Sequence, residues 1–141
     1  GALCLSSVFF EGIAVAFKIE GGIQKAVFPS SFYGFINLFF GVLFSAFSEE
    51  VVYRFYLPQA FKEVLSKKIS NNLKLWVLSE LISLLLFSLG HIYLGFLGFL
   101  NALVCGFFLR FCMIKTKSIW IPFAIHAVYN FLSLLMLFAL S

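Results

Sequence analysis

Several polar and ionisable side chains lie inside the long apolar stretches of this 141-residue sequence. An ionisable side chain in the middle of an apolar spanning helix costs at least about 2.5 kcal/mol, so each one needs a partner or a function. Glu49, Glu50 and Arg54 lie late in one apolar stretch, His91 ends another, and His126 and Asn130 lie in the last. Two carboxylates, two imidazoles, an amide and a guanidinium are typical of a catalytic site rather than of a transport path.

Helical geometry divides the first three of these residues into a pair and a free acid. Glu50 and Arg54 are four residues apart and share a helix face, so the guanidinium can neutralise the Glu50 carboxylate. Glu49 projects about 100° further round the same helix. The spacing therefore predicts a Glu50–Arg54 ion pair and leaves Glu49 for other work.

The histidines lie on other helices, and the chain brings one of them level with Glu49. His126 and Asn130 are four residues apart and point the same way. The helices before and after the turn at Ser70 form a hairpin, and Glu49 and His91 lie nearly the same number of residues from this turn. At about 1.5 Å of rise per residue, they therefore lie at nearly the same height. We therefore expect the acid and the imidazoles to converge.

The predicted cluster contains the parts needed to hydrolyse a peptide bond without a covalent intermediate. A carboxylate in a low-dielectric cavity is a stronger base and can take a proton from water. Amide and imidazole N–H groups can hold a developing oxyanion. The sequence has no GxSxG motif, no HExxH motif and no aspartate, so serine-elbow, zincin and aspartyl-dyad mechanisms are excluded.

The composition predicts that lipid surrounds the helices that carry these residues. Hydrophobic residues make up 62% of the chain and charged residues 11%, against roughly 25% charged in an ordinary soluble domain. The mean hydropathy is +1.06. The net charge of +4 comes from basic residues near the ends of apolar runs, a pattern that does not indicate nucleic-acid binding.

The apolar periodicity predicts an all-α fold, a polytopic transmembrane bundle of about five helices in one domain over residues 1–141. Ser31 and Ser118 are expected to cap the second and fifth helices, and Pro58 is expected to kink the second. Beyond Pro58 an amphipathic piece should project past the bilayer or lie on its surface. The second helix is expected to start near residue 32, and the other expected helices span residues 2–19, 73–91, 93–114 and 118–140.

The basic residues also predict an orientation, because cytoplasmic loops carry an excess of Lys and Arg. Two turns that helix topology places on the same side are basic. Their residues are Lys62, Lys67, Lys68 and Lys74 in the first, and Arg110, Lys115 and Lys117 in the second. We expect that side to be cytoplasmic. Glu11 and Glu80 receive no role and are expected near an interface or paired within the bundle.

Three motifs in order on separate helices identify a resemblance. Residues 49–54 read EExxxR, residues 87–91 read FxxxH and residues 126–130 read HxxxN, with the stretch 117–122 leading into the last. In this combination they resemble the CPBP family of CAAX proteases and bacteriocin-processing enzymes, also called the ABI family, which includes type II CAAX prenyl endopeptidases. The resemblance covers residues 44–131. Members usually have more helices, so we expect this chain to lack N-terminal helices of a longer protein.

The resemblance implies catalytic roles for the first glutamate of EExxxR and for the polar residues of the other two motifs. Glu49 would be the general base, and His91 would help to activate the attacking water. His126 and Asn130 would form the oxyanion hole. The implied activity is that of an intramembrane endopeptidase acting on a membrane-associated peptide or lipidated protein, with lipids as its other partners. The compact loops favour a bacterial cell membrane.

Alternatives remain for the cofactor and for the function. Glu50 and Arg54 would be structural or orienting in the family, and an ion pair that only stabilises two buried charges would have the same sequence. The mechanism needs no cofactor, but two histidines and a glutamate can in principle bind zinc. A non-catalytic membrane scaffold or a bacteriocin self-immunity protein, in which the polar cluster only joins helices, is the second function. A small transporter is the third.

Overall fold

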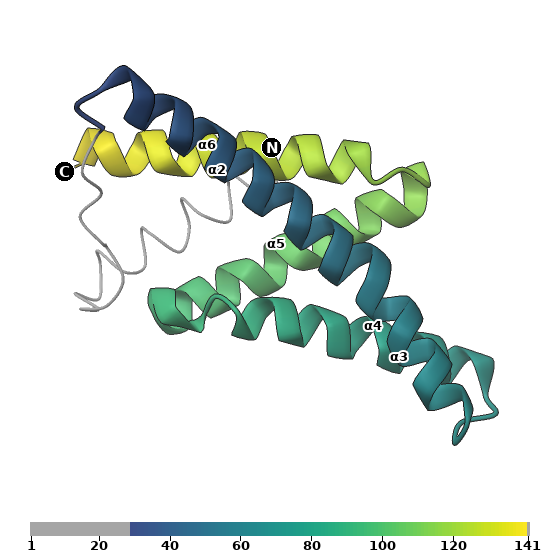
Figure 1. Ribbon diagram of the computed structural model, residues 1–141. Coiled ribbons are helices and arrows are strands. Elements are labelled where there is room, and N and C mark those ends of the chain that lie inside the picture. Colours follow the sequence, from purple (N-terminus) through teal and green to yellow (C-terminus); the bar gives the residue numbers. More distant parts are fainter. Residues whose placement is uncertain (1–28, 141) are drawn as a thin grey trace.

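The computed structural model describes residues 29–140, and its regular structure over that range is entirely helical (Figure 1). The elements are α2 (Phe32–Glu49), the π-helical segment η1 (Glu50–Tyr56), α3 (Leu57–Ser66), α4 (Asn72–Leu89), the 3₁₀ turn η2 (Ile92–Leu94), α5 (Gly95–Thr116) and α6 (Trp120–Leu140). The predicted all-α class is confirmed. The helix expected over residues 2–19, which includes Glu11, lies outside the described residues.

The segments α2, η1 and α3 form one continuous helix that crosses the molecule diagonally (Figure 1). It begins at Ser31, whose hydroxyl accepts a hydrogen bond from the Gly34 amide at 3.1 Å, so the predicted cap is confirmed. The first part of this helix packs on α6, the last part packs on α4, and η1 contacts α4 and α5. The π-helical segment therefore lies where the long helix passes from one neighbour to the next.

Pro58 stands in the first turn of α3, where a missing backbone N–H is tolerated. The chain stays helical through this position, and the departure from α-helical geometry occupies the seven residues before it. A π-helix has one extra residue between hydrogen-bonded partners, as in the bond from the Leu57 amide to the Val52 carbonyl. We did not predict this extra residue from the spacing of apolar residues in the sequence.

The remaining helices form antiparallel hairpins with short, capped connections. Asn71 accepts a hydrogen bond from the Lys74 amide at 2.9 Å and so begins α4. The α4 helix ends two residues before His91, at Leu89. Lys117 ends α5 in the left-handed region, with φ 52°, and Ser118 accepts a bond from the Trp120 amide at 3.3 Å. These caps follow the turns predicted from the sequence.

The distribution of side chains in the described residues is the reverse of that in a soluble globule. Three helices, Phe32–Ser66, Asn72–Leu89 and Ile92–Thr116, have the length and the apolar character needed to cross a membrane. Most large apolar side chains are exposed, as expected where lipid is the solvent. The fully buried polar side chains are Glu50, Arg54, Ser79, Ser83, Ser88 and His126. The chain is thus built as a multi-pass membrane protein with a polar interior.

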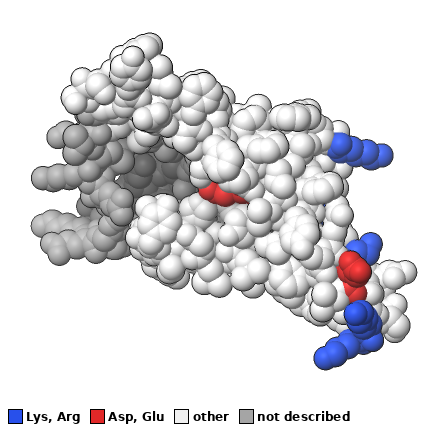
Figure 2. All heavy atoms as spheres, viewed as in Figure 1, with Lys and Arg blue, Asp and Glu red and all other residues white. Residues whose placement is uncertain are grey.

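Lysine side chains gather at one end of the molecule, where α3 turns into α4 and α5 turns into α6 (Figure 2). The same view shows an acidic side chain in the apolar middle of the visible face. Arg110, which we predicted in the second basic turn, instead lies within α5 and is only 25% exposed. Its position is explained by Glu80 on α4, with which it forms an ion pair.

Candidate active site

The ionisable cluster is built around the junction of α2 with the π-helical segment. Glu49 is the last residue of α2 and Glu50 the first of η1. His91 follows the end of α4 and His126 lies in α6. Helices that are distant in sequence therefore bring four titratable side chains together, as the motif spacing predicted. π-Helical turns occur frequently at functional sites, where they redirect side chains.

Glu49 lies between the two imidazoles. Its Oε2 atom is 3.7 Å from His126 Nε2 and 3.9 Å from His91 Nε2. The Ser45 hydroxyl, one turn earlier on α2, donates a 2.7 Å hydrogen bond to the other carboxylate oxygen, Oε1. Oε2 is buried and has no hydrogen-bond partner among the described residues. The carboxylate is thus held by one oxygen while the other faces the histidines.

His91 is oriented by the backbone of α4. Its Nδ1 atom is 2.9 Å from the Phe87 carbonyl oxygen. Because a carbonyl oxygen only accepts hydrogen bonds, Nδ1 carries the proton and donates it. In the neutral ring this leaves Nε2, which faces Glu49, with a lone pair. The side chain is 25% exposed, so this face of the cluster is accessible.

His126 is held between the two glutamates and is 4% exposed. Its Nδ1 atom is 2.7 Å from Glu50 Oε1, and its Nε2 atom faces Glu49. An ionised carboxylate only accepts, so His126 donates through Nδ1 to Glu50. A buried carboxylate that fixes the ring orientation of a histidine in this way also stabilises the imidazolium form. Glu50 is therefore connected to the site through His126 as well as through Arg54.

The predicted Glu50–Arg54 pair is present, at 3.6 Å between Glu50 Oε2 and Arg54 Nε. Both side chains are buried, with exposures of 0% and 2%. The Arg54 guanidinium carbon lies 3.6 Å from the centroid of the Phe87 ring. This stacking supplies a cation–π interaction in a place that water does not reach. The terminal nitrogens of Arg54 have no hydrogen-bond partner within the described part of the chain.

Phe87, the first residue of the FxxxH motif, contacts several side chains of the site. Its ring centroid lies 4.7 Å from that of His91, 6.3 Å from that of His126 and 5.4 Å from that of Tyr53. The side chain is 3% exposed. One aromatic ring thus contacts both imidazoles and the guanidinium, while its carbonyl fixes the His91 ring.

Asn130 is the predicted site residue that the structure does not connect to the others. It is half-buried on α6, one turn beyond His126. Over residues 29–140 no hydrogen bond or ion pair joins it to Glu49, His91 or His126. The four remaining residues of the cluster and Arg54 are joined by the contacts described above.

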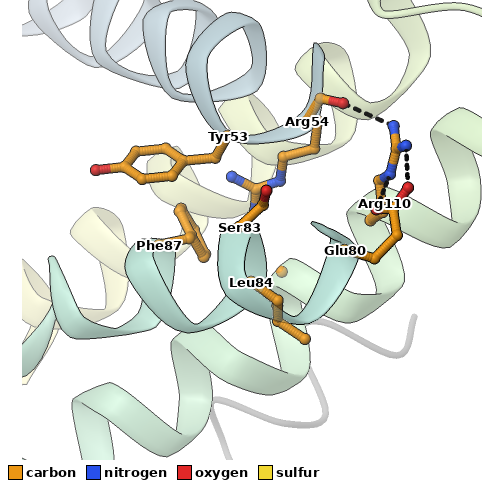
Figure 3. A pocket seen from close by; sticks show the side chains of 8 residues that line it. Tyr53, Arg54, Glu80, Ser83, Leu84, Phe87 and Arg110 are labelled. Carbon is orange, nitrogen blue, oxygen red and sulfur yellow. Dashed lines mark hydrogen bonds and ion pairs between the residues drawn. The ribbon is translucent and has the colours of Figure 1, made fainter. Parts of the chain in front are cut away.

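A second ion pair adjoins the cluster and was not assigned any role from the sequence. Arg110 binds both carboxylate oxygens of Glu80, with 2.6 Å between Arg110 Nε and Glu80 Oε2. A further guanidinium nitrogen, Nη1, donates to the backbone carbonyl of Arg54 at 2.6 Å. Figure 3 shows these bonds beside a small pocket. The pocket is lined by Tyr53, Arg54, Glu80, Ser83, Leu84, Phe87, Gly106 and Arg110.

The Ser45–Glu49 hydrogen bond and the Glu80–Arg110 ion pair were both missing from the sequence-based prediction, and they differ in how easily they could have been predicted. Ser45 stands one helical turn before Glu49, so its bond could have been anticipated from spacing alone. Glu80 and Arg110 are opposite charges in apolar helices 30 positions apart. The requirement that buried charges be paired was the available signal for them.

The geometry does not form an obvious metal centre in the described residues. No group of three or more His, Cys, Asp and Glu side chains there is arranged to hold a metal ion. The separations of 3.7 and 3.9 Å between Glu49 and the two Nε2 atoms leave space between these groups. The residues have the donor types of a zinc site, so zinc stays an alternative for the cofactor.

The fold and the cluster define the chain as a polytopic helical membrane protein with a partly buried glutamate–histidine site. A family model described as type II CAAX prenyl endopeptidase Rce1-like matches residues 29–132, which is most of the chain and includes all three motifs. The chain belongs to this family of endopeptidases, and the predicted resemblance is confirmed. Comparisons with curated proteins and with solved structures found no match.

Proposed function

We propose that the chain is an intramembrane endopeptidase that cleaves a peptide bond near the end of a membrane-associated, prenylated protein or peptide. Family membership supports the reaction class. The observation that carries the proposal is the convergence of both imidazole Nε2 atoms on one carboxylate oxygen of Glu49. An ion pair that only joined helices would not need an acid held by one oxygen with the other directed at two imidazoles.

In the proposed mechanism, water binds between Glu49 Oε2 and His91 Nε2. The neutral His91 ring accepts one hydrogen bond from this water, and Glu49 removes the other proton as the oxygen attacks the scissile carbonyl carbon. The separation of 3.9 Å between the two protein atoms is too long for a direct hydrogen bond and leaves each free to contact the water. The attack forms a tetrahedral intermediate with an oxyanion.

His126 stabilises that oxyanion through Nε2–H. Its Nδ1 proton is engaged by Glu50, so donation from Nε2 requires the imidazolium form. The imidazolium also balances the buried charges, because two glutamates then face one arginine and one histidine cation. The intermediate collapses when the C–N bond breaks, and Glu49 returns its proton to the leaving amine.

Asn130 is proposed as a second oxyanion donor that engages when substrate is bound. The proposal rests on the HxxxN motif and on the position of Asn130 one turn from His126 on the same helix. Catalytic hydrogen bonds are often absent or long without substrate, so the lack of a contact in the described residues does not contradict this role. The basic turns at one end of the bundle are proposed to be cytoplasmic.

The decisive test replaces the proposed base. Glu49→Gln keeps the size of the side chain but cannot accept the water proton, so hydrolysis of a prenylated CAAX peptide should fall by at least about a thousandfold. The product is measured by mass spectrometry with the protein in bilayers. Glu63→Gln, on an exposed face of α3, is the matched control and should retain activity. Comparable turnover by Glu49→Gln and the parent chain would refute the proposal.

The non-catalytic scaffold makes the opposite prediction for the same pair of variants. In that case neither the parent chain nor the Glu63 control cleaves prenylated or unmodified membrane peptides. The Glu49 variant then keeps whatever binding the parent chain has, because a neutral amide can still accept the Ser45 bond.

A further inference from the structure

The Arg54 carbonyl lies near the end of the π-helical segment, where the helix cannot supply its usual hydrogen-bond donor. The last π-type bond runs from the Leu57 amide to the Val52 carbonyl. A return to α-helical spacing would place the next bond between residue 58 and the carbonyl of residue 54. Residue 58 is proline and has no N–H, so Arg54 lacks this donor. A carbonyl left unpaired in an apolar interior is costly.

Arg110 supplies the missing donor from another helix. Its Nη1 atom lies 2.6 Å from the Arg54 carbonyl oxygen, while Nε and Nη2 bind the Glu80 carboxylate (Figure 3). The guanidinium fork therefore joins α4, α5 and η1 at a single point. A lysine could replace the charge opposite Glu80, but its single nitrogen does not reproduce the three separate donors in fixed geometry.

The π-helical turn needs such support because it sets the direction of the catalytic side chains. Glu49 and Glu50 stand at its beginning, and α3, beyond its end, packs on α4. Loss of the extra residue of the turn would rotate α2 relative to α3 by about 100°. Such a rotation would move Glu49 away from His91 and His126.

We propose that Arg110, anchored by Glu80, is a positioning residue. It supplies the hydrogen bond to the Arg54 carbonyl that Pro58 cannot donate, and so stabilises the π-helical turn that directs Glu49 at the histidines. The role in catalysis rests on the proposed function. Arg110 reaches the reacting atoms only through the backbone of Arg54. Its effect is therefore on the orientation of the general base and not on contact with substrate.

The test uses a second-site variant that restores the missing donor. Arg110→Lys should lower kcat for the prenylated CAAX peptide about tenfold and change KM by less than about twofold. Pro58→Ala supplies an amide to the Arg54 carbonyl and by itself should change kcat by less than about twofold. The double variant should recover most of the lost activity. Lys115→Gln, a cation lost from the exposed end of α5, is the control.

Full activity of Arg110→Lys would overturn the inference. So would an Arg110→Lys, Pro58→Ala double variant whose kcat is as low as that of Arg110→Lys alone. A merely structural ion pair gives that second result, because Pro58→Ala does nothing for Glu80. Amide hydrogen exchange at Leu57 provides a readout independent of activity. It should rise in Arg110→Lys and return to the parent value in the double variant. If the parent chain cleaves nothing, the proposed function fails, while the exchange data still decide the role of Arg110.

Discussion

At the scale of single residues, the site depends on Glu50 serving two partners at once. One of its oxygens accepts a bond from His126 at 2.7 Å, and the other faces Arg54 at 3.6 Å. The carboxylate thus fixes the imidazole and compensates a guanidinium that is almost completely buried. A stability role and an orienting role therefore coexist in one side chain, and they can be separated by mutation.

Glu50→Gln should lower stability and activity together. Removing one partner of a buried ion pair leaves the other charge uncompensated and costs about 3–5 kcal/mol. Replacing both partners, as in Glu50→Gln with Arg54→Met, removes that penalty and keeps an apolar contact with Phe87. The double variant should therefore regain thermal stability in detergent but not peptidase activity, because His126 still lacks its carboxylate. Recovery of both properties would contradict an orienting role for Glu50.

The residue scale is also where the sequence was most informative. Spacing of four predicted the Glu50–Arg54 pair, and a count of residues from the Ser70 turn placed Glu49 beside His91. The sequence does not encode which ring nitrogen faces which carboxylate, because that depends on the orientation of α6 against α2. The bond between His126 and Glu50 joins residues 76 positions apart and is set by this packing.

At the scale of helices, the close approach of α5 to α4 holds Phe87 under the guanidinium. Gly106 on α5 faces Phe87 and Leu84 on α4. A Cβ atom at Gly106 would lie 2.8 Å from Phe87 Cδ1 and 2.7 Å from Leu84 Cδ1. Both distances are shorter than van der Waals contact, so a larger residue at position 106 would force Leu84 and Phe87 to move.

Gly106→Ala should therefore destabilise the protein by about 1–3 kcal/mol, the usual cost of overpacking a filled interior. The displacement of Phe87 should also reduce activity, because this ring contacts Arg54 and His91. Gly41→Ala on α2 is the matched control, since a Cβ there meets no atom within 4 Å. It should leave stability unchanged or raise it by up to about 1 kcal/mol. Thermal unfolding in detergent measures both changes, and equal effects of the two substitutions would contradict this account.

The helices themselves were largely predictable, whereas the irregular segment between them was not. Apolar runs, the serine caps and the polar turns located most of the helix ends within a few residues of the observed ones. The π-helical turn at residues 50–56 was not predicted from the sequence, although its extra residue rotates the following helix by about 100°. Arg110 was placed in a loop because its partner, Glu80, becomes visible only when α4 and α5 are packed together.

At the scale of the whole molecule, polar groups are enclosed and apolar groups face outward over the described residues. The lysines lie beyond the apolar zone, at the end where α3 meets α4 and α5 meets α6 (Figure 2). The α4–α5 connection at η2 lies at the opposite end (Figure 1). This arrangement predicts that both basic turns face the same side of the membrane and that η2 faces the other.

Single cysteines test this topology in a chain whose three native cysteines are replaced by alanine. Lys67→Cys and Lys115→Cys should react with a membrane-impermeant thiol reagent from the cytoplasmic side only, because both positions are exposed at the basic end. Tyr93→Cys should react only from the opposite side, since Tyr93 is 67% exposed within η2. Labelling of the two lysine positions from different sides would show that the helices do not cross the membrane as the structure arranges them. Reaction of both from the outer side would reverse the proposed orientation.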